Sequence, residues 1–403
     1  MDGFKFLNGK CEDILPTLPE NSIDTCLTDP PYEISMLAKQ WDKTGVSFQP
    51  ETWKHVLRIL KPGGFLLAFG GTRTWHRMVC AIEDAGFEIR DAVAWVHAQG
   101  MPKSLDISKA FDDAAGVERV VVGPPKYSKG KPKQSYSETR KVSYDCQPLP
   151  QTEPATDEAK KWQGWGTGIK PAFELIVVAM KPLEGTFARN AQQWGVSGLA
   201  IDKCRIGFAS EADEKESKSK NQHEDLDSGP RDNHSFGKDS GPRKNYDPPG
   251  RWPANLVLDP VTAALLDQQS GWTKTKRIEK PSDCGGNTWG GTIQGHRGAR
   301  GYTDEGGASR FFFCAKASPS ERGSYNDHVT VKPLALMEWL CNLTSTPDGG
   351  TVLDPFMGSG TTGLACYRTK RKFIGIDKDP HYVEIAERRL REEAEGHPPG
   401  IFE

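Results

Sequence analysis

The sequence predicts an α/β protein with a mostly parallel sheet and helices on both faces. Over about the first 100 residues, short apolar runs of strand length alternate with segments of helical periodicity, and the alternation returns after residue 350. This pattern is typical of a parallel sheet covered on both sides. Between the two parts lies a long stretch rich in glycine and charged residues, which we expect to project from the sheet.

The N-terminal elements follow one another closely. Strands are predicted at Phe4–Leu7, Ile23–Thr28, Phe65–Phe69 and Phe87–Trp95, and helices at Glu51–Leu60 and Trp75–Ala85. Trp53, Val56 and Leu57 recur at helical spacing, and the Lys-Pro-Gly-Gly run after Leu60 is expected to end that helix. Gly86 is placed to cap the second helix.

The C-terminal part repeats this arrangement. Strands are predicted at Thr351–Asp354 and Lys372–Ile376, and helices beginning at Thr361–Tyr367 and over His381–Glu393. Asp379 and Pro380 supply an N-cap and a proline in the first helical turn.

Composition excludes some classes of protein and leaves others open. No apolar run approaches ~20 residues, so we expect no membrane span. The N-terminus lacks a signal-peptide pattern, and the nine cysteines show no metal-ligand spacing, so we expect a cytoplasmic protein without a metal. The net charge is −2, but the stretch from Lys126 to Lys141 contains six basic residues and only one acid. Such a run fits a solvated surface as well as a DNA contact.

The segment Val352–Thr362 has the form of a nucleotide-binding turn. A predicted strand ends in Asp354, a turn with Gly358 and Gly360 follows, and a helix then begins with free N–H groups. Asp377 ends the next strand, 23 residues after Asp354, where a carboxylate can accept hydrogen bonds from ribose hydroxyls. The turn is neither G-x-G-x-x-G nor a P-loop, which disfavours a dinucleotide or a triphosphate. A glycine-rich turn can be purely structural, but the two acids together favour a nucleoside.

A second polar turn, Asp29-Pro30-Pro31-Tyr32, follows the apolar run Ile23–Thr28. It could be only a proline exit from a strand, with Tyr32 on the surface. The functional interpretation is a site for a planar amine, in which Asp29 and the Pro30 carbonyl accept N–H groups and Tyr32 stacks on the ring. Attack of such an amine on a methyl donor depends more on positioning than on acid–base chemistry.

Three segments together resemble one known family. "TDPPY" (Thr28–Tyr32), "HVTVKPLALMEWL" (His328–Leu340) and "DPFMGSGTT" (Asp354–Thr362) resemble the catalytic, cofactor-flanking and cofactor motifs of S-adenosyl-L-methionine-dependent DNA amino-methyltransferases. The catalytic motif comes first, as in the circularly permuted β class, which implies a Rossmann-like methyltransferase sheet. Phe6–Leu15, Leu60–Gly71 and Gly168–Leu183 are similar to bacterial and phage members. Val329 is a departure, because the family usually has proline there.

The resemblance implies a role for each matched residue. The catalytic residues would be Asp29, Pro30, Pro31 and Tyr32. The cofactor-binding residues would be Asp13, Asp29, Lys332, Asp354, Pro355, Phe356, Gly358, Ser359, Gly360, Thr361 and Asp377. Among these, Asp13 would lie near the adenine of the cofactor and Lys332 near its methionine end. Without the motif, Asp13 would be a helix N-terminal acid and Lys332 a surface lysine.

The resemblance also implies a domain organisation and a partner. Residues 1–186 would form the catalytic half, with a basic loop at 122–165, and residues 311–403 the cofactor half. Residues 187–310 would be an inserted recognition region for double-stranded DNA, with a flexible insertion at 210–250. The candidate DNA contacts are Lys129, Lys131, Lys133, Arg297, Arg300 and Arg310.

The sequence therefore predicts methyl transfer from S-adenosyl-L-methionine to the N6 amine of a flipped-out adenine in DNA. N4-cytosine methylation remains an alternative, since the family only tends to replace the acid of Asp29 by serine for cytosine. An RNA or protein amine, or a DNA-binding regulator with a vestigial cofactor site, are further alternatives. A homodimer and a cognate restriction endonuclease are left open.

Overall fold

The computed structural model describes residues 3–34, 44–98, 100, 104–123, 151–219, 248–274, 305–315, 325–328 and 331–396. The chain forms two compact units. The larger comprises Met1–Ala98, Glu174–Arg322 and Asn326–Glu403, and the smaller comprises Gln99–Phe173 and Gly323–Tyr325. The predicted segment boundaries after residues 186 and 310 stay a prediction.

The larger unit is built on a nine-stranded sheet with the order β1-β13-β12-β2-β3-β7-β4-β8-β11. Its strands are β1 Phe4–Asn8, β2 Ile23–Thr28, β3 Leu60–Gly70, β4 Glu88–Val96, β7 Phe173–Met180, β8 Leu256–Leu258, β11 Phe313–Cys314, β12 Thr351–Asp354 and β13 Lys372–Asp377. The pairs from β1 to β3 are parallel, whereas β7 runs antiparallel to β3. The predicted mostly parallel sheet is confirmed.

The strand β3 begins earlier than predicted. The Lys-Pro-Gly-Gly run that follows Leu60 lies inside the strand and does not separate it from the preceding helix. The register of β2 against β3 shifts between Ile23 and Thr25, and this irregularity accommodates the extra residues. Gly63 has φ +77° and donates its N–H to the carbonyl of Lys181, so the strand is anchored there.

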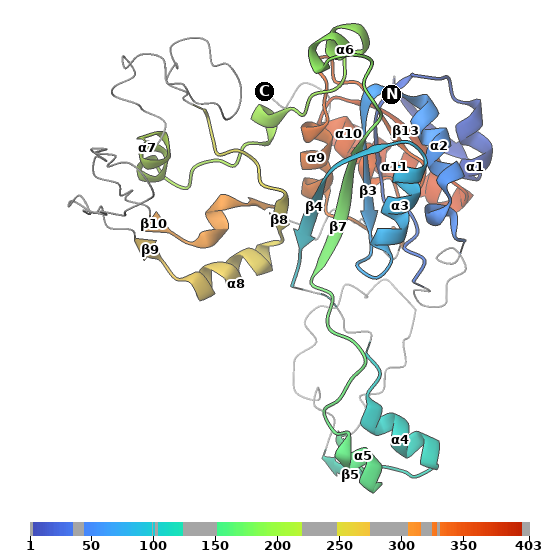
Figure 1. Ribbon diagram of the computed structural model, residues 1–403, viewed down its shortest axis with the longest axis vertical. Helices are drawn as coiled ribbons and strands as arrows, with labels where there is room; N and C mark the ends of the chain where they lie inside the picture. Colours follow the sequence, from blue (N-terminus) through green and yellow to red (C-terminus); the bar gives the residue numbers. More distant parts are fainter. Residues whose placement is uncertain are drawn as a thin grey trace, which may run out of the picture. The chain divides into compact units, whose positions relative to one another are not determined.

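Helices cover both faces of the sheet (Figure 1). On one face lie α1 Cys11–Ile14, the 3-10 helix η1 Leu15–Thr17, the 3-10 helix η4 Val46–Phe48, α2 Pro50–Ile59 and α3 Trp75–Asp84, and on the other α9 Leu334–Leu343, α10 Thr361–Arg368 and α11 Pro380–Gly396. Because successive strand residues point to opposite faces, Cys26 packs toward α2 and Leu27 toward α9. The sheet therefore separates two apolar cores.

The segment between β7 and α9 extends the sheet. Its elements are α6 Phe187–Trp194, the 3-10 helix η5 Ile201–Cys204, α7 Glu211–Ser219, β8, α8 Pro260–Ser270, β9 Thr273–Lys274, β10 Glu305–Gly306, the 3-10 helix η6 Ala308–Phe311 and β11. β8 pairs in parallel with β4, and β11 pairs in parallel with β8. Two strands of the inserted segment thus continue the catalytic sheet.

The predicted flexible insertion begins with an ordered helix. Glu211–Ser219 form α7, where the sequence predicted a loop. The buried Asp213 carboxylate accepts the N–H of Ala209 at 2.8 Å and forms an ion pair with Arg251, which ties α7 to the rest of the unit. The low aliphatic content of this stretch misled the prediction, because one buried acid anchors the helix. Residues 220–247 lie outside the described residues.

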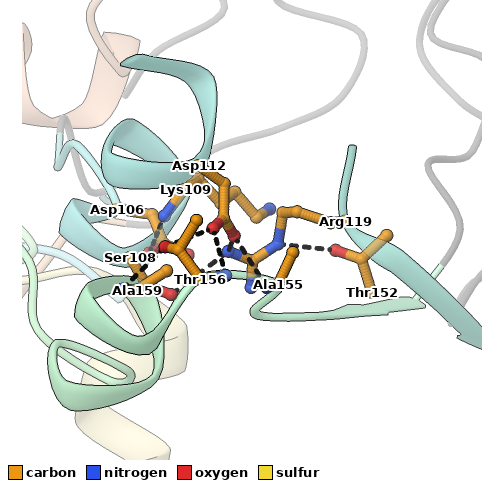
Figure 2. Close-up of polar contacts among 9 residues, drawn as sticks. All are labelled: Asp106, Ser108, Lys109, Asp112, Arg119, Thr152, Ala155, Thr156 and Ala159. Carbon is orange, nitrogen blue, oxygen red and sulfur yellow. Dashed lines mark hydrogen bonds and ion pairs between the residues drawn. The ribbon is translucent and has the colours of Figure 1, made fainter. Parts of the chain in front are cut away.

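The smaller unit is organised around one buried carboxylate. It contains α4 Ile107–Ala115, β5 Val120–Gly123, β6 Gln151–Glu153 and α5 Asp157–Lys161. Asp112 accepts hydrogen bonds from the N–H and hydroxyl of Thr156 and from the N–H of Ala155, and it pairs with Arg119 at 2.7 Å (Figure 2). Arg119 also donates to Thr152 at 3.1 Å, so α4, β6 and the start of α5 are joined.

Candidate active site

The strand order brings the two polar turns to one edge of the sheet. β2, β12 and β13 are adjacent and parallel, and they end at Thr28, Asp354 and Asp377. Asp29 therefore starts the turn beside Asp354, although the two lie far apart in the sequence. The carboxyl edge of a parallel sheet is where open α/β folds bind ligands.

Lys332 lies at the centre of a polar cluster at this edge. Its ammonium contacts Asp29 Oδ2 at 2.8 Å, Glu174 Oε2 at 3.0 Å and the Tyr32 hydroxyl at 2.9 Å. The Tyr32 hydroxyl donates in turn to Glu174 Oε2 at 2.8 Å. The ammonium nitrogen of Lys332 also lies 5.2 Å from the centroid of the Tyr32 ring and 4.9 Å from the centroid of the Phe69 ring. The cluster joins β2, β7 and the segment before α9.

Burial and charge set the protonation of this cluster. Burial acts to lower the pKa of Lys332, but the carboxylates of Asp29 and Glu174 hold it above its ordinary value. Burial also acts to raise the pKa of Glu174, and the charge and hydrogen bonds of Lys332 and Tyr32 bring it below the usual range. Burial, with the two nearby carboxylates, raises the pKa of Tyr32. At neutral pH, Lys332 is an ammonium and Tyr32 a neutral phenol.

Asp29 keeps one oxygen without a partner. Its Oδ2 pairs with Lys332, whereas its Oδ1 is buried and accepts no hydrogen bond from any residue that the structure describes. A buried acceptor without a donor is costly, and in functional sites it is commonly reserved for a ligand. The geometry thus offers a place for one N–H group beside Tyr32.

The backbone of the proline turn is held from the turn that joins β3 to α3. The carbonyl of Tyr32 accepts the hydroxyl of Thr74 at 2.6 Å. A Cβ on Gly71 would lie 3.0 Å from Tyr32 Cδ2, so a side chain there would displace the ring from this backbone. Pro30 is buried and Pro31 is half-buried in the same turn. The ring of Tyr32 is therefore fixed at both its backbone and its hydroxyl.

The Asp354 carboxylate is held by donors of the chain, and its predicted place in the cofactor lining stays a prediction. It is 2% exposed and accepts hydrogen bonds from Thr28 at 2.7 Å, from Thr362 at 2.6 Å and from the N–H of Phe356 at 3.1 Å. Burial raises its pKa to about 7, although these hydrogen bonds favour the ionised form. Asp354 is the internal support of the glycine-rich turn.

The second half of the turn also faces inward. Arg389 of α11 donates to the Ser359 carbonyl and hydroxyl at 2.7 and 3.2 Å, and to the Thr361 hydroxyl at 3.1 Å. A Cβ on Gly360 would lie 2.6 Å from Ala386 Cβ. The side chains of Ser359 and Thr361 therefore contact α11, and the predicted place of these residues in the cofactor lining stays a prediction. Packing against α11 accounts for the residue types at Ser359, Gly360 and Thr361.

Gly358 and Asp377 present the open part of the turn. The Gly358 N–H donates to Asp377 Oδ2 at 3.0 Å, and the N–H of Asp379 donates to Oδ1 at 2.8 Å. Gly358 has φ +51°, and a Cβ there would lie 2.8 Å from His328 Nε2. Burial raises the pKa of Asp377, which is half-buried at the end of β13. Phe356 is half-buried beside this turn, and Pro355 is buried.

Asp13 is exposed in α1, at the same edge of the sheet. The N–H of Gly9, just before α1, donates to the carbonyl of Asp377 at 2.9 Å. The structure thus brings the predicted adenine-side acid near the predicted ribose acid in the fold, and its role stays a prediction.

Sequence reasoning missed Glu174. The residue belongs to the segment Gly168–Leu183 and directly precedes a buried apolar run, which was the available signal. β7 pairs antiparallel with β3, with Leu175 opposite Gly70, so Glu174 reaches the edge where β2 ends. An antiparallel strand begins where its neighbours end, and the apolar run alone does not reveal its direction.

Arg310 does not present its guanidinium for DNA. Its side chain is 7% exposed, and its Nε lies 3.9 Å from Asp213. Its guanidinium lies 4.2 Å from the centroid of the Phe311 ring. The predicted DNA contact is therefore corrected, because Arg310 belongs to the packing around α7. The other candidate contacts, Lys129, Lys131, Lys133, Arg297 and Arg300, lie outside the described residues, as does Val329.

No helix among the residues that the structure describes combines the length and the apolar character needed to cross a membrane. In the same residues, His, Cys, Asp and Glu side chains form no group of three or more that could hold a metal ion.

The protein is thus an α/β protein in which the proline turn and the glycine-rich turn follow two adjacent parallel strands. The chain belongs to the DNA methylase family N6_N4_Mtase, whose profile matches residues 23–388.

Curated relatives share a short segment with the chain. The type II methyltransferase M2.DpnII of Streptococcus pneumoniae is 50% identical over 68 residues, which cover 17% of this chain and 25% of the relative. The DNA adenine methyltransferase YhdJ of Escherichia coli K12 is 46% identical over 66 residues, which cover 16% and 22%. The chain thus matches a quarter or less of the length of these two relatives. A solved structure, the cytosine-N4-specific PvuII DNA methyltransferase, aligns over 97% of this chain and 87% of its own at 14% identity, with a TM-score of 0.45.

Proposed function

We propose that the protein transfers a methyl group from S-adenosyl-L-methionine to the N6 amine of adenine in double-stranded DNA. The observation that carries the proposal is the buried Asp29 Oδ1, which accepts no hydrogen bond from the described part of the chain and lies beside the fixed ring of Tyr32. Membership of the DNA methylase family supports DNA as the substrate. The acid at position 29 favours adenine, since the family resemblance associates serine there with cytosine.

The cluster positions the amine and does not deprotonate it first. Asp29 Oδ1 and the Pro30 carbonyl accept the two N–H groups, and Tyr32 stacks on the base. Lys332 is fully engaged by Asp29, Glu174 and Tyr32, and its raised pKa keeps it protonated, so it does not serve as a base. Two carboxylates against one ammonium leave a net negative charge, which favours the positive charge that develops on the attacked nitrogen.

The residues of the turn fit the methyl donor. When bound, S-adenosyl-L-methionine supplies an activated methyl group on a sulfonium. Asp377 is half-buried, and each of its oxygens accepts one backbone N–H and retains a lone pair for a ribose hydroxyl. Gly358, which tolerates no Cβ, allows close approach of the backbone, and Phe356 offers a half-buried apolar ring. Asp377, Gly358 and Phe356 would hold the cofactor, with Asp13 toward its adenine.

A base inside the double helix does not reach a pocket of this kind, so the target adenine is flipped out of the stack. We assign sequence recognition to the segment 187–310, with Arg297 and Arg300 as candidate base contacts. Lys129, Lys131 and Lys133 are candidate phosphate contacts. The proposal extends to a protein that acts in the cytoplasm of a bacterium or a phage-infected cell, and it leaves a homodimer and a cognate endonuclease open.

The test is to express the protein in a host without adenine methylation and digest its DNA to nucleosides for mass spectrometry. N6-methyladenine supports the proposal. N4-methylcytosine in its place would reassign the target base, and neither product would reject the activity. The Asp29→Ala variant, expressed at the same level, is the matched control. Single-molecule sequencing of the same DNA then identifies the methylated site.

A further inference from the structure

Glu174 accepts the hydrogen bond from the Tyr32 hydroxyl. Tyr32 has one O–H to donate, and it donates to Glu174 Oε2 at 2.8 Å. Asp29 lies in the same cluster, because Lys332 contacts both the Tyr32 hydroxyl at 2.9 Å and Asp29 Oδ2 at 2.8 Å. Burial raises the pKa of Tyr32, and the Asp29 carboxylate adds to this effect through charge and hydrogen bonding. Asp29 is thus the second carboxylate of the cluster, joined to the hydroxyl through Lys332.

We infer that Glu174 is a positioning residue for the methyl transfer proposed above, on which this inference rests. By accepting the Tyr32 hydroxyl and sharing Lys332, Glu174 leaves Asp29 Oδ1 free for the substrate amine. Without Glu174, the hydroxyl turns to Asp29 and occupies the acceptor that the amine needs. Glu174 therefore determines which carboxylate accepts the Tyr32 hydroxyl, and it acts on the amine only through Asp29 and Tyr32.

The surroundings of Glu174 support this role. Its side chain is 24% exposed, and one oxygen, Oε2, takes both the Lys332 and the Tyr32 contacts. The other oxygen faces His97 Nε2 at 3.9 Å, from the end of β4. The contacts of Oε2 form a closed triangle of hydrogen bonds with Lys332 and Tyr32. A closed triangle holds the hydroxyl in one orientation, which an isolated ion pair with Lys332 would not do.

The experiment is a double-variant cycle on the turnover number, measured with radiolabelled S-adenosyl-L-methionine and unmethylated DNA. The variants are Glu174→Ala, Glu174→Gln, Tyr32→Phe and the double variant Tyr32→Phe/Glu174→Ala. Glu174→Ala should lower kcat by ~10²-fold, the usual effect of disturbing a positioned group at a reacting centre. Glu174→Gln keeps an acceptor for the hydroxyl and should stay within ~10-fold of the wild type, by the same comparison.

The double variant shows whether Glu174 acts by orienting the Tyr32 hydroxyl or contributes independently of it. Phenylalanine has no hydroxyl to place on Asp29, so Tyr32→Phe should restore kcat of Glu174→Ala several-fold. Losses that multiply would overturn the inference, because they would mean that the two side chains act independently. Glu174→Gln that is as slow as Glu174→Ala would also overturn it, by showing that charge and not the acceptor matters. If Glu174→Ala does not fold, the comparison of Glu174→Gln with the wild type decides the matter, because a loss in kcat well beyond ~10-fold would overturn the inference.

Two controls separate this inference from the proposed function. The affinity for S-adenosyl-L-methionine and the thermal midpoint should change little in Glu174→Gln and Tyr32→Phe, since neither side chain lies in the Gly358 turn. A loss confined to either quantity would make Glu174 a structural residue only and would reject the inference. If the wild type itself methylates no DNA, the proposed function fails, which is a different result from an active wild type with additive variants.

Discussion

The Thr28 hydroxyl donates a 2.7 Å hydrogen bond to Asp354, a residue 326 positions later in the sequence. Thr28 is the last residue of the strand that carries Asp29, and Asp354 supports the turn of Gly358 through Thr362 and Phe356. All of these contacts are buried or partly buried at the edge of the sheet. The bond therefore couples the amine-binding turn to the turn proposed to hold the cofactor.

Asp354 should make the stability depend on pH. Its pKa of about 7 in the folded state lies above the ordinary 3.8, so between these values the folded state retains a proton that the unfolded state has released. The free energy of unfolding attributable to Asp354 therefore falls as pH rises toward 7, by up to about 1.4 kcal/mol per pH unit. Asp354→Asn removes this contribution. Urea unfolding of both proteins at pH 5.5, 6.5 and 7.5 should show the asparagine variant gaining relative stability as pH rises.

Thr28→Val is the matched control for this measurement. It removes a donor to the ionised carboxylate, so the pKa of Asp354 should rise further and the fall in stability should extend to higher pH. A constant difference between Asp354→Asn and the wild type across the three pH values would contradict the prediction. It would mean that the carboxylate is already ionised throughout this window.

Asp29→Ala should lower the rate of methyl transfer by ~10²–10³-fold, because the amine loses a positioned acceptor. The variant leaves Lys332 paired with Glu174, so the fold and the cofactor turn should persist. Binding of S-adenosyl-L-methionine, measured by calorimetric titration, should stay within a few-fold of the wild type. Methyl incorporation above a tenth of the wild-type rate would reject the role of Asp29.

Asp377→Ala should weaken S-adenosyl-L-methionine binding by ~2–4 kcal/mol, because the ribose hydroxyls lose a charged acceptor. The change also removes the acceptor for the N–H of Gly358, which would loosen the turn. Asp377→Asn is the control, since its amide oxygen can still accept that N–H. Calorimetry should place it between the wild type and alanine, and an unchanged dissociation constant in the alanine variant would refute the assignment.

Local sequence patterns predicted the strands that carry the two motifs. β2 and β12 begin and end where the apolar runs Ile23–Thr28 and Thr351–Asp354 do, because buried parallel strands are short and bounded by turn residues. Asp29 and Asp377 could then be placed at one edge from the alternation of elements alone. The local sequence pattern is therefore enough to predict the position of residues that lie at or directly after the end of a strand.

Residues whose role depends on distant partners were missed or misread. Glu174 pairs with Lys332, which lies 158 positions later, and reaches it only because β7 is antiparallel. Arg310 has its acidic neighbour, Asp213, in a helix that the composition did not indicate. The hydrogen bond from Thr28 to Asp354 joins two separate motifs. Such pairings arise from tertiary packing, and residue spacing does not contain them.

The arginines of the recognition segment should divide into two kinds. Arg310→Ala removes a charge packed against Asp213 and Phe311, so it should lower stability and reduce methylation evenly at all sites. Arg297→Ala or Arg300→Ala should instead change which sites are methylated, at ~1–3 kcal/mol for each lost base contact. Neutralising Lys129, Lys131 and Lys133 together should weaken binding to all DNA and flatten its salt dependence.

Methylome sequencing of hosts that express each variant separates the two kinds, with thermal unfolding as the companion measurement. A changed methylation motif in Arg310→Ala would show that this side chain leaves its packed position to read DNA. An unchanged motif in both Arg297→Ala and Arg300→Ala, with activity lost evenly, would reduce their region to an electrostatic surface. Recognition would then have to come from the rest of the segment, where β8 and its flanking residues continue the catalytic sheet and give base contacts a rigid support.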